Sequence, residues 1–338
     1  MHKFRHTLAH KIVMEAKNAT LKRIVCLGGG SGGTSTLMSG LKDHSFHITS
    51  VTSMADDGGS SGRLRKAYGI MPPGNLVSCI ASLIPEENSE LSDLMMYRFP
   101  GNAKENKTLG GHKLGNLIML AEMLRTHDIY KALEVTQKLF GITNADILPA
   151  TDERTRLSAI TVDGRRIHTE TTLDLALYAE PYGLKKIYLT PKKPKVNQKV
   201  LDNIALADII ISGPGDLYTN QLPVLVIPQI RDAIIASKAK KIFILNVANK
   251  PFESKGYKLH DFVNAIEDHL GVFPFDTIIA NNNFTNRIPK KYRYGYVKVD
   301  PASKNDMKYQ LIEDDFVDKN FPIHHNAKKL ASVVAKTL

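Results

Sequence analysis

Apolar runs alternate with segments of helical periodicity along most of the chain. Strand-like apolar runs fall at residues 22–29, 46–54, 185–191, 208–216, 224–228, 241–249 and 275–283. Segments with helical spacing fall at 34–42, 74–84, 90–98, 112–126, 128–140, 197–207, 229–238 and 259–270. Buried parallel strands read as continuous apolar runs, and helices cover both faces of such sheets. The alternation therefore predicts an α/β fold with a mainly parallel sheet.

Two parts of the chain interrupt this alternation. The helical segments of about 74–140 follow one another without a strand between them, so we expect an inserted helical region. Around Asp163 and Gly164, a turn signal, the apolar positions alternate and predict a β-hairpin over about 157–171. Residues 1–20 are basic and lack a continuous apolar stretch. We therefore expect an N-terminal extension over 1–20 and a single α/β domain over 21–338.

Four of the predicted strands end in loops that are rich in glycine or in polar residues. These loops read LGGGSGGTS, TSMADDGGSSG, ISGPGDLYTN and LNVANKP. In open α/β sheets, ligands bind at the carboxyl ends of the strands, where the strand order switches direction. The sequence therefore predicts a ligand site built from these four loops.

The first of these loops joins a predicted strand to a predicted helix. Its glycines allow the backbone to approach an anion, and the helix N-terminus offers unpaired amides. Gly28, Gly30 and Gly33 fit the dinucleotide pattern G-x-G-x-x-G, but the acid expected about 20 residues later is poorly matched. The loop also lacks the Gly-Lys-Ser/Thr ending of a Walker A motif. We interpret it as a phosphate-binding turn; the alternative is a tight turn without a ligand.

The second loop places two adjacent acids before a run of small residues and a basic segment. Successive side chains of an extended chain point in opposite directions. We therefore predict that Asp57 faces the ligand and that Asp56 points back into the fold. A carboxylate can hold Mg²⁺ or accept hydrogen bonds from a polar ligand. Ser60, Ser61 and Arg63 are candidates for phosphate contacts; the alternative is a helix cap in a solvated turn.

Three further stretches supply candidate ligand contacts. Asn75 follows two prolines at a predicted helix start, where a stiff cap is the alternative. His112 and Asn116 are spaced to share one face of a helix that starts near His112. Gly213 and Gly215 flank a proline where a buried strand ends, so the backbone turns sharply there. Polar residues follow at the rim of this turn: Asp216, Tyr218, Thr219 and Asn220.

The overall charge limits the classes of partner. The chain has 338 residues and a formal net charge of +11, which favours anionic partners. It contains no helix-turn-helix, zinc-ligand spacing or aromatic RNA-binding signature, so we expect no specific nucleic acid partner. Cys26 and Cys79 are expected to be small buried side chains rather than a disulfide framework. No apolar run reaches the length of a membrane span, and no secretory signal is evident, so we expect a cytoplasmic protein.

Together the motifs resemble those of a known family. GGGSGG, ADDGGSSGRLR, MPPGN, LGGHKLGN, ILPAT and SGPGDLYT occur in this order between about residues 22 and 283. This set is similar to the CofD-like superfamily, and specifically to its YvcK-type gluconeogenesis factor branch. The resemblance implies a Rossmann-like, three-layer, doubly wound sheet. It also implies a nucleotide site formed by Gly29, Gly30, Ser31 and Gly32, by Asp56, Asp57 and Arg63, by His112 and Asn116, and by Gly213 and Gly215.

The resemblance implies two functions. The first is a nucleotide-sugar-binding protein, with a UDP-sugar as ligand and a regulatory role in carbon metabolism, cell-wall synthesis and cell shape. The second is a transferase that moves a phospholactyl-nucleotide group to a deazaflavin with Mg²⁺, for which Asp57 is the candidate catalytic residue and metal ligand. Whether the chain is an enzyme or a homo-oligomer stays open, as do a nicotinamide-dependent oxidoreductase and a charge-driven nucleic acid binder.

Two positions depart from the pattern of the resembling family. Asn75 and the residues after it stand where the family has Asp-Ile-Arg-Asn, so a carboxylate and a guanidinium are missing. Lys250 stands in NVANKPFES, at a position where the family has glutamine. These departures are typical of a divergent subgroup with its own ligand.

Overall fold

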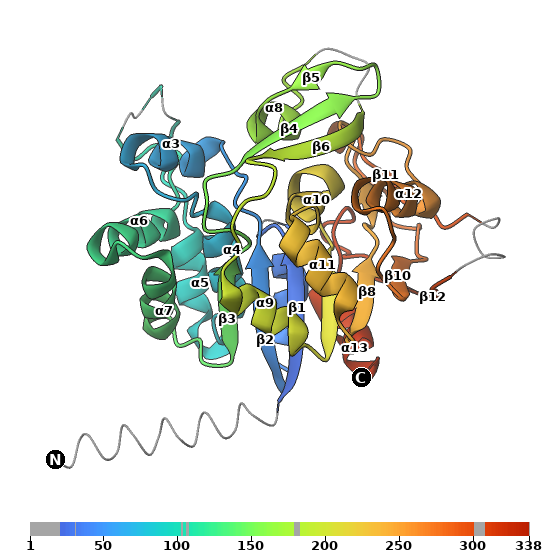
Figure 1. The fold of residues 1–338 in the computed structure, drawn as a ribbon, viewed down its shortest axis with the longest axis horizontal. Coiled ribbons are helices and arrows are strands. Elements are labelled where there is room, and N and C mark those ends of the chain that lie inside the picture. Colours follow the sequence, from blue (N-terminus) through green and yellow to red (C-terminus); the bar gives the residue numbers. More distant parts are fainter. Residues whose placement is uncertain are drawn as a thin grey trace.

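The computed structural model describes residues 21–30, 32–102, 104–105, 108–178, 183–300 and 308–337. Within these ranges, seven parallel strands form a central sheet in the order β12-β10-β8-β7-β1-β2-β3 (Figure 1). Their bounds are Lys22–Gly28 for β1, Phe46–Thr52 for β2, Ala145–Pro149 for β3, Ile209–Ser212 for β7, Lys240–Ile244 for β8, Thr277–Asn281 for β10 and Gln310–Asp314 for β12.

The strand order reverses beside β1. The chain moves from β1 through β2 to β3 on one side, and then returns to the other side of β1 with β7. This reversal creates a switch point between β1 and β7, where their carboxyl ends diverge into separate loops. The predicted doubly wound α/β fold is confirmed, and the expected extension over 1–20 lies outside the described residues.

Helices cover both faces of the sheet because its central strands are apolar on both sides. In β1, Ile24 and Cys26 pack into one buried cluster, whereas Val25 and Leu27 pack into the other. The first cluster is covered by α2 (Thr34–Leu41), α4 (Gly74–Leu83), α5 (Ser89–Met96), α6 (Leu114–Thr126), α7 (Ile129–Leu139) and α13 (Ala327–Lys336). The second is covered by α9 (Gln198–Ala205), α10 (Leu222–Leu225), α11 (Pro228–Ala236) and α12 (Leu259–Leu270).

The predicted helices of 74–140 form, with α3 (Gly59–Tyr68), the long connection between β2 and β3. Helix α4 is buried along most of its length and packs against β2 and β3. This segment is therefore an enlarged crossover of the main sheet as well as a cluster of extra helices. A short 3₁₀ turn, Glu86–Asn88, joins α4 to α5.

The predicted hairpin belongs to a second, antiparallel sheet. Strands β4 (Arg156–Thr161), β5 (Arg166–Ile167) and β6 (Leu184–Thr190) pair in the order β5-β4-β6. Helix α8 (Glu170–Asp174) follows β5. Figure 1 shows this small sheet and α8 at the top of the view, at the end of the main sheet where the carboxyl end of β1 lies.

Several elements differ from the sequence predictions. The apolar run at 224–228 is not a strand: it covers the end of α10, a turn at 226–227 and the first residue of α11. Val224, Leu225 and Ile227 are buried in the core, which accounts for the apolar composition of the run. The small-residue loop after Asp57 is largely helix α3. Strands β3 and β12 and helix α13 were not predicted. The remaining described elements are a π-helical turn at Leu217–Gln221, a two-residue pair, β9 (Ala248–Asn249) and β11 (Gly295–Tyr296), and a 3₁₀ turn at Lys290–Tyr292.

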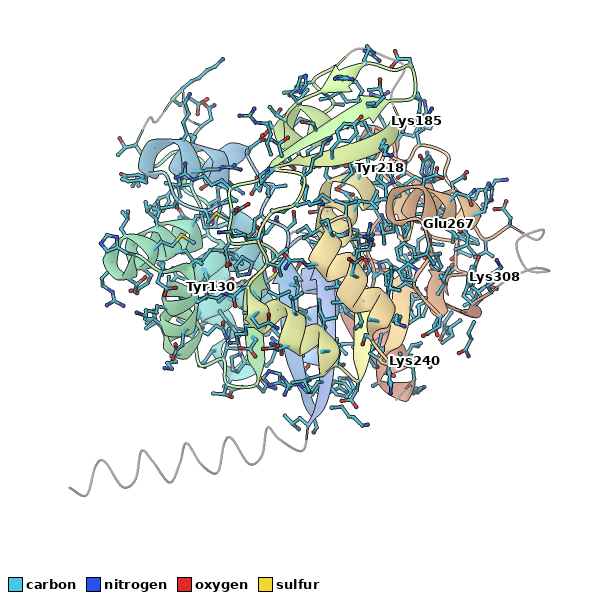
Figure 2. The ribbon with its side chains drawn as sticks, viewed as in Figure 1. Tyr130, Lys185, Tyr218, Lys240, Glu267 and Lys308 are labelled. Carbon is cyan, nitrogen blue, oxygen red and sulfur yellow. The ribbon has the colours of Figure 1, made fainter. Side chains whose placement is uncertain are left out.

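Other sequence expectations concern burial and membrane association. Cys26 and Cys79 are free and buried, as expected. Among the helices of the described ranges, none is both long and apolar enough to span a membrane. Lys185 and Lys308, which Figure 2 labels at the periphery, are exposed. These two lysines therefore add positive charge to the outer surface.

Candidate functional site

The four predicted loops meet at one edge of the sheet. Strands β8, β7, β1 and β2 are consecutive neighbours, and each ends at this edge. Three cavities lie there. The largest, called the central cavity below, has a volume of about 330 Å³. A hydroxyl-lined cavity of about 310 Å³ and a turn cavity of about 220 Å³ adjoin it, since Lys113 borders the first two and Asp216 borders the central and turn cavities.

The central cavity has two chemically different walls. One wall consists of the starts of α3 and α4 with nearby polar and basic groups: Gly58, Gly59, Ser60, Ser61, Gly74, Asn75, Arg98, Lys113 and Asn116. The other wall contains four carboxyl groups, which come from different segments of the chain: Asp56, Glu170, Asp174 and Asp216. Thr171, Leu175, Thr219 and Asn220 also line the cavity. The cavity can therefore meet an anionic group on one side and a cationic or hydroxyl group on the other.

Asp56 and Asp57 point in different directions, as expected. Each of them, however, points in the direction that was expected of the other. Asp56 lines the central cavity and accepts a hydrogen bond from the Gly58 amide at 3.2 Å. Asp57 instead turns to α8, where Oδ1 accepts bonds from the Thr171 amide (2.9 Å) and hydroxyl (2.8 Å). The prediction that Asp57 faces the ligand is wrong in its geometry. Strand β2 ends at Thr52, so the pleat no longer determines side-chain direction at these positions.

Burial changes the protonation of the cavity-facing acid. Desolvation raises the pKa of Asp56, although hydrogen bonds from Ser61 and Gly58 act in the opposite direction. The neighbouring carboxylates Asp57 and Asp174 raise this pKa further. Asp56 is thus the acid of the pair that can hold or release a proton at the cavity surface.

Ser60 joins two of the predicted site residues. Its Oγ lies 2.8 Å from His112 Nδ1 and accepts a hydrogen bond from Asn116 Nδ2 at 2.9 Å. Helix α6 starts at Leu114, so His112 precedes the helix rather than sharing a face with Asn116. The two side chains nevertheless meet, because both bond to Ser60, and their contact with a ligand stays a prediction. Burial, with Arg63 nearby, lowers the pKa of His112 and favours its neutral form.

One atom of this group has no protein partner. Asn116 is 1% exposed and lines the central cavity, and its Oδ1 forms no hydrogen bond within the described residues. A buried amide oxygen without a partner is costly in a folded protein. Oδ1 is therefore available to accept a hydrogen bond from a bound ligand.

Arg63 does not face the cavity. Its guanidinium donates to the carbonyl of Gly110 at 2.5 Å, and so supports the loop before α6. Arg63 thus bonds to a backbone carbonyl here, and its expected contact with a phosphate or an acid stays a prediction. Arg98 and Lys113 supply the positive charge of the cavity instead, and sequence analysis did not single them out.

Ser61 and Asn75 fix the start of α4 against the second loop. Ser61 Oγ accepts the amide of Gly74 at 3.0 Å, and Asn75 Nδ2 donates to the Ser53 carbonyl at 3.2 Å. Both side chains are buried and line the central cavity. These residues therefore fix the start of α4, as the stiff-cap interpretation expected, and they also face the cavity in which a ligand would lie.

The glycines of the first loop serve two different purposes. A Cβ on Gly29 would lie 1.9 Å from Asn220 Oδ1, and a Cβ on Gly30 would lie 1.9 Å from the Asn75 carbonyl oxygen. These glycines are required by packing within the protein. Gly32 has a φ of +75° and open space around it, and it borders both the hydroxyl-lined and the turn cavity. Ser31 lies outside the described residues.

The Gly-Pro-Gly turn after β7 closes the switch point. Gly213 has a φ of +85° and lies close to the Ile244 carbonyl, so it is a packing residue. Gly215 borders the turn cavity, and its amide donates to Asn246 Oδ1 at 3.2 Å. Tyr294 and His324 supply rings to the same cavity. Tyr218, expected at the rim, is instead 1% exposed, and Figure 2 shows it beneath the small sheet.

The acidic wall contains the residues that sequence analysis missed. Glu170 and Asp174 lie on α8, four positions apart, after the hairpin. Burial raises the pKa of Glu170 to about 9, and Asp56 and Asp174 add to this effect. A helix of five residues is too short to be predicted from its hydrophobic pattern. The position of these acids at the cavity also depends on the folding of the small sheet over it.

A buried lysine lies behind the acidic wall. Lys250 Nζ is 2.8 Å from Asp216 Oδ2 and 3.1 Å from Glu253 Oε1, and it also bonds to Asp174 Oδ1. The Lys250 side chain is 9% exposed and that of Glu253 is fully buried. The departure noted at position 250 thus lies beside the central cavity.

These features define a doubly wound α/β protein with a polar ligand site at the switch in its strand order. Comparison with known proteins gives the family. The chain belongs to the CofD family, since residues 24–317 match 2-phospho-L-lactate transferase CofD. It lies in the gluconeogenesis factor branch of that family, as the motifs predicted.

Two relatives and one solved structure illustrate the similarity. The gluconeogenesis factor of Bacillus subtilis is 36% identical over 94% of this chain and 98% of its own length. A putative gluconeogenesis factor of Nostoc is 35% identical over 93% of this chain and 68% of its own. A crystal structure of a UPF0052 family member from Bacillus halodurans superposes with a TM-score of 0.83, at 34% identity, over 94% of this chain and 99% of that one.

Proposed function

We propose that this chain binds a nucleotide sugar, with a UDP-sugar as the first candidate, at the switch point between β1 and β7. We further propose that it acts in the cytoplasm as a regulator of carbon metabolism, cell-wall synthesis and cell shape. The relatives named gluconeogenesis factor support the link to carbon metabolism.

The observation that carries the proposal is the position of Gly32. This residue borders the hydroxyl-lined cavity and the turn cavity, and it directly precedes the N-cap of α2. The N-cap, Gly33, has no side chain to satisfy the first amides of the helix. A diphosphate is suited to such a place, because helix N-termini and glycine turns bind anions.

The two cavities beside Gly32 suit the two ends of a nucleotide sugar. Tyr294 and His324 in the turn cavity offer rings against which a base can pack. Ser35, Ser78 and Ser82 in the other cavity offer hydroxyl groups to a sugar. A ligand that crosses Gly32 would fill both cavities with its phosphates at the glycine turn.

A transferase is the second candidate, because one observation favours it. The central cavity shares Asp216 with the turn cavity, so a second substrate could lie next to the bound nucleotide. In that case Asp56 is better placed than Asp57 to act on the substrate or to hold Mg²⁺, since Asp57 is bonded to Thr171. The oxidoreductase and nucleic acid alternatives gain no comparable support.

Calorimetric titration with UDP-N-acetylglucosamine, GDP and NAD, with and without Mg²⁺, tests the ligand class. Asn246→Asp keeps the acceptor for the Gly215 amide but adds a negative charge to the turn cavity. We expect it to weaken UDP-sugar binding by about tenfold or more through repulsion of the diphosphate. Gln198→Glu, an exposed change on α9, adds the same charge far from the cavities and is the control.

Two outcomes would count against this assignment. If Asn246→Asp and the parent bind the UDP-sugar with equal affinity, the diphosphate does not lie near the turn cavity. Preference for GDP, with a covalent product detected by mass spectrometry after addition of a deazaflavin acceptor, would favour the transferase.

A further inference from the structure

The buried cluster around Lys250 has the composition of a metal site. Asp174, Asp216 and Glu253 each offer a carboxylate oxygen, and these three oxygens lie within 4.8 Å of one another. Carboxylate oxygens at this spacing are typical ligands of Ca²⁺, Mg²⁺ and Mn²⁺. The ammonium group of Lys250 contacts all three carboxylates.

Each acid of the cluster is held by the fold. Glu253 accepts bonds from the Tyr218 amide at 3.1 Å and the Thr219 hydroxyl at 2.7 Å, so its carboxylate cannot turn away. Asp216 follows the β7 turn, and Asp174 ends α8. Three carboxyl groups are thereby fixed close together, and a cation at their centre offsets their mutual repulsion.

We infer that Lys250 is a tethered cation, whose ammonium group occupies the position that a divalent metal ion would take among these three carboxylates. The site is consequently closed to metal ions in this protein. The lysine also determines specificity, because Asp174 and Asp216 line the central cavity and their charge is directed towards Lys250 rather than towards a ligand-borne cation.

The charge state of Lys250 agrees with this role. Burial lowers its pKa, but the combined field of Glu253, Asp216 and Asp174 outweighs burial and raises the pKa above its usual value. The three carboxyl groups therefore favour the charged form of the Lys250 ammonium group. Unlike a metal ion, it cannot be removed by a chelator.

Replacing the lysine by a neutral side chain of similar length should open the site. We expect Lys250→Met to have a lower melting temperature than the parent in EDTA, and to recover much of the loss in Mn²⁺. Titration followed by Mn²⁺ electron paramagnetic resonance should show an additional bound ion per chain relative to the parent. Asp216→Asn in the same background removes a ligand and should weaken this binding at least about tenfold, a typical effect for a metal ligand.

Lys255→Met is the matched control, because Lys255 is exposed and lies five positions further along the chain. It should match the parent in melting temperature and Mn²⁺ binding. Lys250→Gln is the second variant, for the case in which Lys250→Met does not fold without a metal; its soluble yield should then rise with Mn²⁺ in the growth medium.

The inference is overturned if neither Lys250 variant binds more Mn²⁺ than the parent, or if Mn²⁺ does not stabilise them or raise their yield more than it does for the parent. None of these measurements uses a nucleotide. Failure of the nucleotide-sugar proposal would therefore leave the result for Lys250 unaffected.

Discussion

The two walls of the central cavity are built on opposite principles. The wall made by the starts of α3 and α4, with Arg98, Lys113 and Asn116, comes from the single connection between β2 and β3, and its side chains bond mainly to each other and to nearby backbone. The acidic wall combines Asp56 from the loop after β2, Glu170 and Asp174 from α8, and Asp216 from the turn after β7, which are far apart in the sequence. A single connection therefore shapes the first wall, whereas the packing of distant segments shapes the second.

The two walls differ in how they contribute to stability and to ligand binding. The first wall satisfies its polar groups internally, with the exception of Asn116 Oδ1 among the described atoms. The acidic wall gathers carboxyl groups that raise the pKa of Glu170 and Asp56. Lys250 offsets part of that repulsion. The first wall is therefore held in place by its own hydrogen bonds. In the second wall the repulsion between carboxyl groups is unfavourable, and a bound ligand can reduce it.

The largest expected effect comes from removing the innermost acid. Glu253→Ala leaves Lys250 with fewer partners and deprives the Tyr218 amide and Thr219 hydroxyl of their acceptor. We expect a loss of about 3 kcal/mol in the free energy of unfolding, as for other broken buried ion pairs. Urea denaturation measures it. Glu267→Ala on the exposed surface of α12, labelled in Figure 2, is the control and should change stability by less than about 0.5 kcal/mol.

The glycine loop should be sensitive at Gly30 and tolerant at Gly32. Gly30→Ala forces a Cβ into the Asn75 carbonyl, so the first wall must shift, and we expect a loss of about 2 kcal/mol. Gly32→Ala meets open space and suffers only from its positive φ, at about 1 kcal/mol. Thermal unfolding of both variants decides. Equal losses would show that the loop is strained throughout rather than packed at Gly30.

The stability of the acidic wall should depend on pH through Glu170. Its pKa is about 9 in the folded chain, against 4.5 as its ordinary value, so the folded state holds a proton that the unfolded state loses. The contribution of Glu170 to stability is greatest below pH 4.5 and falls as the pH rises to 9. Glu170→Gln cannot ionise, and its free energy of unfolding should exceed that of the parent at pH 9 by at least about 1.4 kcal/mol, the value of a single pKa unit.

Denaturation curves at pH 4 and pH 9 provide the comparison. The two proteins should be nearly equal at pH 4 and should separate with increasing pH. Glu87→Gln, an exposed change after α4, is expected to follow the parent at both values. If Glu170→Gln is no more stable than the parent at pH 9, the charge of the acidic wall is neutralised in another way.

The smallest effects distinguish the two adjacent acids. Asp57→Asn weakens the charged hydrogen bonds to Thr171, and we expect a loss of about 1 kcal/mol with faster amide exchange in α8. Asp56→Asn removes a buried acid that is already destabilised in its charged form, so stability should be unchanged within about 0.5 kcal/mol or improve. Hydrogen exchange and thermal unfolding test both. A larger loss for Asp56→Asn would restore the division of roles that the sequence suggested.

The sequence was most informative where function follows from the local chain. Continuous apolar runs predicted β1, β2, β7 and β8, and the glycine-rich or polar loops at their ends predicted a shared ligand site at one edge of the sheet. The alternation of side chains along β2, however, ends at Thr52. The orientations predicted for Asp56 and Asp57 were therefore the reverse of those observed. The apolar run at 224–228 was ambiguous because a fully buried helix and a buried strand show the same composition.

The acidic wall could not be predicted from such patterns. Glu170 and Asp174 on α8 are separated from Glu253 by whole elements, and their proximity depends on how the small sheet folds over the cavity. Lys250 was noticed as a departure from the family pattern and Asp216 as a rim residue, but neither their contact nor the partners Asp174 and Glu253 were predicted. A polar residue that becomes fully buried, such as Glu253, gives no periodic signal in the sequence.

The pairing of β1 with β7 has a consequence for synthesis of the chain. Ile24 pairs with Ile209, so the first strand leaves the ribosome long before its neighbour exists. At about 5–20 residues per second, the interval is roughly 10–40 s. During this time one edge of β1 is unpaired, and the nascent chain depends on protection of that edge. Ribosome-bound chains arrested before β7 should therefore recruit chaperones more strongly than chains arrested after β8, which selective ribosome profiling would reveal.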